Sequence, residues 1–167
     1  TKTLDIEHPQ EGVLTGFFNP NLNEKNKIIS QLQKGVLLKI TNNLLTPDIN
    51  NNITVSDMIT GYGVSESINH FYNVYGGEVK NKKIIVQGWG NVASSAAYYQ
   101  ALSGAKIVGI IDKNGGLINQ DGFSLKEIKN LFLNKNKNTL NSKDILSYDE
   151  VNSKIWDLKA EIFIPAA

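Results

Sequence analysis

The segment from Lys83 to Asp112 constrains the fold of this chain more than any other part of the sequence. It opens and closes with short apolar runs, at residues 83–87 and 106–112, and an Ala-rich stretch at residues 91–103 lies between them. Apolar runs of this length without polar alternation are typical of strands buried on both faces. The Ala-rich stretch predicts a helix. The segment is therefore expected to be a strand, a turn, a helix and a second strand, with the two strands parallel.

The turn after the first strand is rich in small residues and reads Gly88-Trp89-Gly90-Asn91-Val92-Ala93. In this spacing the first glycine permits a tight turn, the second lets a pyrophosphate approach the backbone, and the alanine lets the helix close on the sheet. Phosphates would then lie at the helix N-terminus, where free amides and the helix dipole favour an anion. Asp112 ends the second strand about 20 residues further on, where a carboxylate can bind both ribose hydroxyls. These features predict a dinucleotide site; the alternative is a purely structural turn.

The rest of the chain continues the alternation of helices and strands. We expect helices over residues 24–40, 60–75 and 124–133, a third strand over residues 161–165, and loops over residues 46–52, 114–116 and 134–138. Ser124 and Glu127 form the capping box of the third of these helices. The predicted fold class is α/β, with a Rossmann-like, doubly wound, mainly parallel sheet that is apparently truncated after its third strand. We divide the chain into an irregular or helical N-terminal segment, residues 1–59, and a dinucleotide-binding domain, residues 60–167.

Composition excludes several other classes of protein. The 17 basic residues, all lysine, are scattered among 16 acidic ones, so we expect no nucleic-acid partner. The absence of cysteine rules out disulfides and thiolate metal sites, and His8 and His70 lie too far apart to suggest a metal. No apolar run approaches the roughly 20 residues of a membrane helix. We expect a cytoplasmic protein without membrane contact.

Five blocks of sequence stand in order along the chain: Thr60–Val64, Val86–Ala93, Gly104–Asp112, Gly115–Ile118 and Ile162–Ala167. Together they resemble the nucleotide-binding domain of the glutamate, leucine, phenylalanine and valine dehydrogenases. The Asp-x-x-Gly-Gly-x-Ile stretch that follows the second strand is most similar to the glutamate enzymes. The resemblance implies an NAD(P)-dependent oxidoreductase of amino-acid metabolism that converts an L-amino acid, expected to be glutamate, into its 2-oxo acid and ammonia. It also implies a homo-oligomer.

The same resemblance assigns site residues. It places Gly88, Gly90, Asn91 and Val92 along the pyrophosphate, Asp112 at the adenosine ribose, Ala166 and Ala167 beside the cofactor, and Thr60 near the nicotinamide, although Thr60 reads equally well as a helix N-cap. With Ala93 and Lys113, these residues form the candidate cofactor site. The hydroxyls of Ser94 and Ser95 read equally as phosphate contacts or as caps.

We expect NAD rather than NADP as the cofactor. Asp112 would repel a 2′-phosphate, and the chain has no arginine to hold one. The adjacent Lys113 would soften this preference.

The sequence departs from the family where a substrate would be handled. The glycine-rich segment with an essential lysine cannot be found, and Lys34 reads as an ordinary solvated helix residue. Pro47-Asp48 superficially resembles the family's catalytic aspartate segment, but it lies too close to Thr60, and an Asx turn explains Asp48 better. No catalytic residue is therefore assigned, and we expect a fragment of a longer enzyme that is inactive alone. The alternative is a catalytically incomplete nucleotide-binding or regulatory module.

Overall fold

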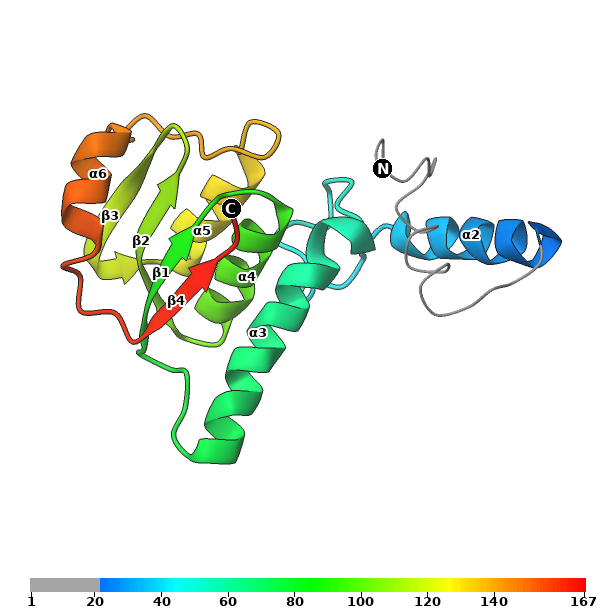
Figure 1. Ribbon diagram of the computed structural model, residues 1–167, viewed down its shortest axis with the longest axis horizontal. Coiled ribbons are helices and arrows are strands. Elements are labelled where there is room, and N and C mark those ends of the chain that lie inside the picture. Colours follow the sequence, from blue (N-terminus) through cyan, green and yellow to red (C-terminus); the bar gives the residue numbers. More distant parts are fainter. Residues whose placement is uncertain (1–21) are drawn as a thin grey trace.

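The computed structural model describes residues 22–167 as a four-stranded sheet with helices packed on it and one N-terminal helix that projects away (Figure 1). The elements in chain order are α2 (Leu22–Val36), α3 (Val55–Tyr75), β1 (Lys83–Gln87), α4 (Asn91–Leu102), β2 (Lys106–Asp112), β3 (Gly115–Phe123), α5 (Leu125–Leu133), α6 (Tyr148–Ile155) and β4 (Ile162–Pro165). The strand order across the sheet is β3-β2-β1-β4.

The sheet is mainly parallel, as the sequence predicts. Strand β1 pairs in parallel with β2 on one side and with β4 on the other. Only β3 is antiparallel, because it forms a hairpin with β2. The connection from β1 through α4 to β2 is the predicted strand, turn, helix and strand. The fold is therefore α/β and Rossmann-like.

Apolar side chains on both faces of the sheet are covered by helices, which makes the sheet doubly wound. On one face, Ile84 and Val86 of β1 belong to a large core that includes residues of α3, α4 and α5. On the other face, Ile85 of β1 packs in a smaller core with Val151 and Ile155 of α6. This two-sided burial explains why β1 is continuously apolar rather than alternating.

Helices α3 and α4 approach each other closely at Gly61. A Cβ atom at this position would lie 2.5 Å from the backbone nitrogen of Ala96 and 2.6 Å from the carbonyl oxygen of Val92. Because real Cβ atoms do not approach backbone atoms so closely, only glycine lets the two helices meet at this distance.

The predicted helix over residues 60–75 begins earlier than expected, at Val55. Its N-cap is Thr54, whose backbone N–H donates to Asp57 Oδ2 at 2.8 Å in a capping box. The reading of Thr60 as an N-cap is therefore wrong. The sequence signal was present, since Thr54 and Asp57 have the capping-box spacing.

The N-terminal helix ends earlier than expected, at Val36 rather than near residue 40. The chain beyond it is extended, because Ile40 N–H donates to the carbonyl of Ile53 at 2.9 Å and Val55 N–H donates to that of Leu38 at 3.0 Å. At α5, by contrast, the capping box of Ser124 and Glu127 is confirmed.

Two elements were missed in the sequence. Strand β3 begins at the Gly115-Gly116 pair that reads as a turn, and its second glycine donates its N–H to the carbonyl of Leu146 at 3.0 Å. Helix α6 lies in the stretch before Trp156 and starts with a capping box of Ser147 and Glu150.

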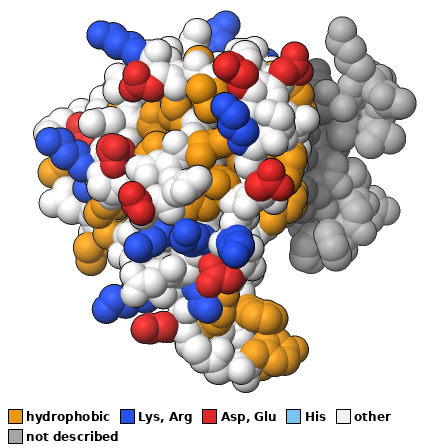
Figure 2. Space-filling model, turned by 90° about the vertical axis from the view of Figure 1, so that its left-hand side faces the viewer, with side chains coloured by type: hydrophobic (Ala, Val, Ile, Leu, Met, Phe, Trp, Pro, Cys, Tyr) orange, Lys and Arg blue, Asp and Glu red, His pale blue; other side chains and the backbone are white. Residues whose placement is uncertain are grey.

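The surface of the described residues carries charges of both signs, which are interspersed on the face shown in Figure 2. None of the helices described over residues 22–167 is long and apolar enough to cross a membrane. His8 lies outside the described residues, and the division of the chain at residue 60 stays a prediction.

Candidate functional site

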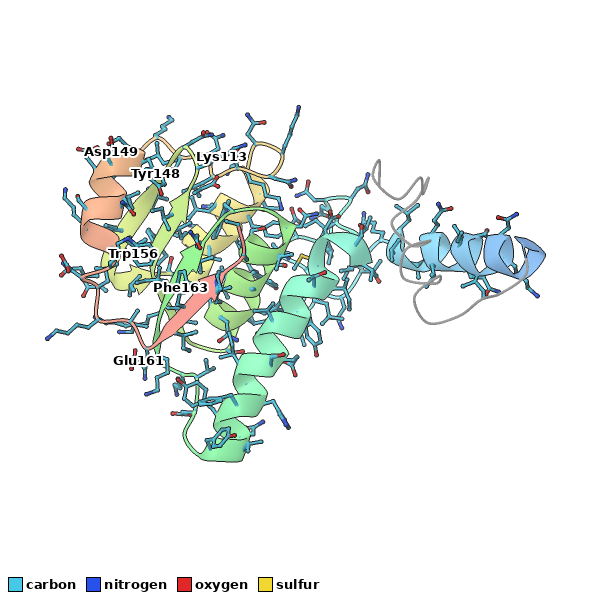
Figure 3. All side chains as sticks on the ribbon, viewed as in Figure 1. Lys113, Tyr148, Asp149, Trp156, Glu161 and Phe163 are labelled. Carbon is cyan, nitrogen blue, oxygen red and sulfur yellow. The ribbon has the colours of Figure 1, made fainter. Side chains whose placement is uncertain are left out.

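A pocket of about 600 Å³ lies where three parallel strands end. Its lining comes from the residues directly after β1, the end of β2, the residues directly after β4 and one residue of the loop after α5. The lining residues are Gly88, Trp89, Gly90, Asn91, Val92, Asp112, Lys113, Asn138, Ala166 and Ala167. After β1 the chain continues to β2 on one side of β1, and it later returns to form β4 on the other side. Open α/β sheets bind ligands at such switch points in the strand order. Figure 3 shows Lys113 at this edge, away from Glu161 at the start of β4.

Eight of the ten predicted cofactor-binding residues line this one pocket. They are Gly88, Gly90, Asn91, Val92, Asp112, Lys113, Ala166 and Ala167. Ala93 is fully buried in the core between α4 and the sheet, which fits its expected packing role. Thr60 is exposed inside α3 and does not line the pocket.

The glycine at the end of β1 is required by the protein itself. Gly88 has φ +88°, and a Cβ there would lie 2.6 Å from the carbonyl oxygen of Ala166. Its N–H donates to the carbonyl of Ile111 at 2.7 Å. The turn is thereby fixed between β2 and the segment that follows β4.

The second glycine of the turn is not required by the protein. Gly90 has φ −71°, which any residue can adopt, and a Cβ would meet nothing closer than Asn138 Cβ at 3.8 Å. It is the N-cap of α4, but it has no side chain to bind the free amides of the first turn. A ligand that approaches the backbone here would explain the glycine, since a side chain would occupy the same space.

Asp112 presents a buried carboxylate at the pocket. The residue is 9% exposed, and its two oxygens accept from backbone N–H groups of Lys113 at 2.9 Å and Leu140 at 2.8 Å. Each carboxylate oxygen has a second lone pair. The carboxylate is therefore held in place with acceptor capacity left for a hydroxyl donor.

Asn91, the first residue of α4, is held from both sides. Its Nδ2 donates to Asp57 Oδ1 at 3.0 Å, and its Oδ1 accepts from Lys135 Nζ at 2.7 Å. The two partners come from the start of α3 and from the loop after α5. The side chain is thus fixed at one wall of the pocket.

Lys135 is the exception in residues 134–138, which were predicted to be a solvated loop and of which the other four are exposed. It is half-buried, its Nζ also donates to Ser94 Oγ at 3.1 Å, and the ammonium lies 4.4 Å from the centre of the Phe132 ring. Burial lowers the pKa of Lys135 from its ordinary value, and the charge of Asp57 opposes this shift. No sequence signal singled it out among neighbouring lysines and asparagines, because its environment is made by contacts distant in the chain.

The remaining candidates lie away from the pocket. Ser94 Oγ donates to the carbonyl of Gly90, and Ser95 Oγ to those of Asn91 and Val92, so both hydroxyls are used inside α4. Asp48 accepts from Asn50 N–H at 2.9 Å, which confirms the Asx turn. Lys34 is exposed on α2 and His70 on α3. Within residues 22–167, no three histidine, aspartate or glutamate side chains gather as metal ligands.

Curated proteins of known function are similar to about two thirds of this chain. Catabolic NAD-specific glutamate dehydrogenase RocG of Bacillus subtilis is 32% identical over 109 residues, which cover 65% of this chain and 24% of RocG. NADP-specific glutamate dehydrogenase of Saccharolobus shibatae is 32% identical over 112 residues, 65% of this chain and 25% of that protein. The chain therefore spans about a quarter of the length of these curated relatives.

Two solved structures have a similar fold. Hetero-hexameric glutamate dehydrogenase from Thermus thermophilus matches with a TM-score of 0.52 at 22% identity, over 66% of this chain and 25% of that one. A second glutamate dehydrogenase matches with a TM-score of 0.50 at 27% identity, over 65% and 25%. The family model of Glutamate/Leucine/Phenylalanine/Valine dehydrogenase matches residues 53–167. The chain thus belongs to the Glutamate/Leucine/Phenylalanine/Valine dehydrogenase family.

Proposed function

We propose that the pocket at the ends of β1, β2 and β4 binds NAD, and that the chain is the nucleotide-binding part of an amino-acid dehydrogenase that acts on glutamate. The observation that carries this proposal is the convergence of the glycine turn and the Asp112 carboxylate on one pocket. Its volume, about 600 Å³, lies within the range of roughly 300 to 1,000 Å³ that is usual for ligand pockets.

The residues present fit a dinucleotide. The backbone at Gly90 is open to the pocket, because a Cβ there would contact only Asn138. The uncapped first turn of α4 offers amide donors to a pyrophosphate, and Asp112 offers carboxylate oxygens to a ribose. When bound, the nicotinamide ring would accept a hydride from the α-carbon of the amino acid. This chain's part is to bind and orient the cofactor.

NAD is proposed over NADP because of Asp112. A 2′-phosphate would meet this buried carboxylate, and the only cation that lines the described pocket is Lys113. The relatives do not decide the question, since they include both NAD-specific and NADP-specific glutamate dehydrogenases.

Isothermal titration of the chain with NAD and NADP tests both parts of this proposal. We expect NAD to bind more tightly than NADP, and Asp112→Asn to reduce that ratio by removing the carboxylate's negative charge. Failure of both nucleotides to bind would overturn the dinucleotide site. Tighter binding of NADP would overturn only the preference for NAD.

A second candidate function is a nucleotide-binding or regulatory module without turnover. The observation in its favour is the lining of the described pocket, in which Asp112 and Lys113 are the only ionisable side chains. The two candidates differ in an assay of the intact gene product with glutamate and NAD. Reduction of NAD would support the dehydrogenase, whereas binding of NAD without its reduction would support the module. Oligomeric assembly and the contact of Thr60 with the nicotinamide stay predictions.

A further inference from the structure

Lys135 occupies a position that is unfavourable for a cation in the chain by itself. Its ammonium contacts Asn91 and Ser94, which both lie in the first turn of α4. This is the positive end of the helix dipole, where anions are stabilised and cations are not. The lysine is also half-buried, so its charge is partly removed from water. Residues that break a local rule in this way are often found at functional sites.

Lys135 contacts a residue that lines the pocket. The ammonium donates to Asn91 Oδ1, and Asn91 lines the pocket while Lys135 itself does not. Asp57 holds the other end of the same amide group. Both oxygens of Asp57 are engaged, one by Asn91 and the other by Thr54. Lys135 thus places a positive charge beside the first turn of α4, and it holds the side chain of Asn91, the first residue of that turn.

We propose that Lys135 is a positioning residue for the pyrophosphate of the dinucleotide, acting through Asn91 and through its charge beside the N-terminus of α4. The inference rests on the proposed function. An anion bound at the first turn of α4 would turn an unfavourable lysine position into a favourable one, because the ammonium would then lie near negative charge. The chain has no arginine, and the glycines of the turn carry no charge. This lysine therefore supplies a positive charge near the pyrophosphate.

The test compares ligands with and without a pyrophosphate. Competition binding of NAD, ADP-ribose and adenosine is measured for the wild type, Lys135→Met, Lys135→Arg and a matched control, Lys126→Met. Lys126 is an exposed residue of α5, so the control removes the same charge away from the pocket. Methionine retains an unbranched apolar side chain without the ammonium, and its sulfur can contact the Phe132 ring that the ammonium faces in the wild type.

We expect Lys135→Met to weaken NAD and ADP-ribose alike by about tenfold, because the attraction between the ammonium and the pyrophosphate is lost, and to leave adenosine binding unchanged. Lys135→Arg should restore most of the loss, and Lys126→Met should bind all three ligands as the wild type does. Equal binding of NAD by Lys135→Met and the wild type would overturn the inference. An equal loss for adenosine would also overturn it, because a general distortion of the pocket would then explain the effect.

Two further measurements separate positioning from folding. The unfolding temperature of ligand-free Lys135→Met should stay close to that of the wild type, since relief of the cost of burying the ammonium offsets the loss of its bonds to Asn91 and Ser94. In an Asn91→Ala background, the effect of Lys135→Met on NAD binding should shrink, because residues that act through each other are not additive. Full additivity would contradict the role of Asn91. If the wild type binds neither NAD nor ADP-ribose, the proposed function itself fails.

Discussion

The buried carboxylate of Asp112 accepts a hydrogen bond from the backbone N–H of Leu140 at 2.8 Å. The bond joins the end of β2 to the loop that follows α5. One residue therefore helps to hold the rim of the pocket together and also faces the space proposed for the ribose. Its substitution should affect stability and binding together.

Asp112→Asn should lower the free energy of unfolding by about 1 to 3 kcal/mol, because a buried acceptor of two backbone N–H groups is replaced by a group that is half donor. NAD binding should weaken as well. Urea denaturation and titration calorimetry measure the two effects. Asp121→Asn, at an exposed position of β3, is the matched control and should change neither. An unchanged unfolding midpoint for Asp112→Asn would show that the two backbone bonds contribute nothing.

Gly88→Ala and Gly90→Ala form a matched pair. Residue 88 has φ +88°, which strains any residue with a side chain, and the added Cβ would lie 2.6 Å from the carbonyl oxygen of Ala166. We therefore expect Gly88→Ala to lower the free energy of unfolding by about 1 to 3 kcal/mol. At residue 90 the backbone is ordinary and the nearest atom is 3.8 Å away, so the variant should fold nearly as well as the wild type. Gly90→Ala should nevertheless lose NAD affinity. Thermal unfolding and NAD titration of both variants measure these effects. Unimpaired NAD binding by Gly90→Ala would contradict the view that the ligand approaches the backbone at this glycine.

The N-caps of α5 and α6 should each contribute to stability. Ser124 and Ser147 accept from the backbone N–H groups of Glu127 and Glu150, both at 3.3 Å. Ser124→Ala and Ser147→Ala should each cost about 1 kcal/mol in denaturant unfolding. Ser67→Ala is the control, because this hydroxyl only bonds back to the carbonyl of Gly63 inside α3. A control as destabilised as the cap variants would argue against capping as the cause.

Glu161 should make stability depend on pH in the acid range. Its carboxylate accepts from the backbone N–H of Lys83 at 2.8 Å and lies 3.5 Å from Lys82 Nζ. The Lys83 bond, followed by the charge of Lys82, holds the pKa of Glu161 below its ordinary value of 4.5. Because the folded-state pKa is depressed, the stabilisation is fully present above the unfolded-state pKa and is lost as pH falls through the folded-state value.

The comparison of wild type with Glu161→Gln measures this contribution. Urea unfolding from pH 7 to pH 3 should show the wild type more stable at neutral pH, with the difference shrinking below about pH 4.5. A difference that stays constant across this range would mean that ionisation of Glu161 does not contribute.

Much of the fold could be predicted because its signals are local. The apolar runs of β1 and β2, the small residues of the turn and the Ser124 capping box each lie within a few residues of sequence. The same local signals predict most of the candidate site, because its residues end a strand or directly follow one, as Gly88, Asp112 and Ala166 do. The carboxyl ends of neighbouring parallel strands must lie together.

The parts that could not be predicted depend on distant contacts. Strand β3 contains Asn119 and Asp121, which are poor strand formers, and its first four residues and Phe123 are held in place by pairing with β2. Lys135 reads as a solvated residue until the fold brings α4 beside it. The Thr54 cap is different, because its signal is local: Thr54 and Asp57 have the spacing of a capping box.

The close approach at Gly61 has a mechanical consequence. Because the backbones of α3 and α4 nearly touch there, neither helix can slide or rotate past the other at this point without a collision. Helix α3 starts at Val55, beside the extended chain that leads back to α2, and α4 starts at Asn91 on the pocket wall. The start of α3 is therefore joined to the pocket wall twice, by this close backbone contact and by the hydrogen bond between Asp57 and Asn91.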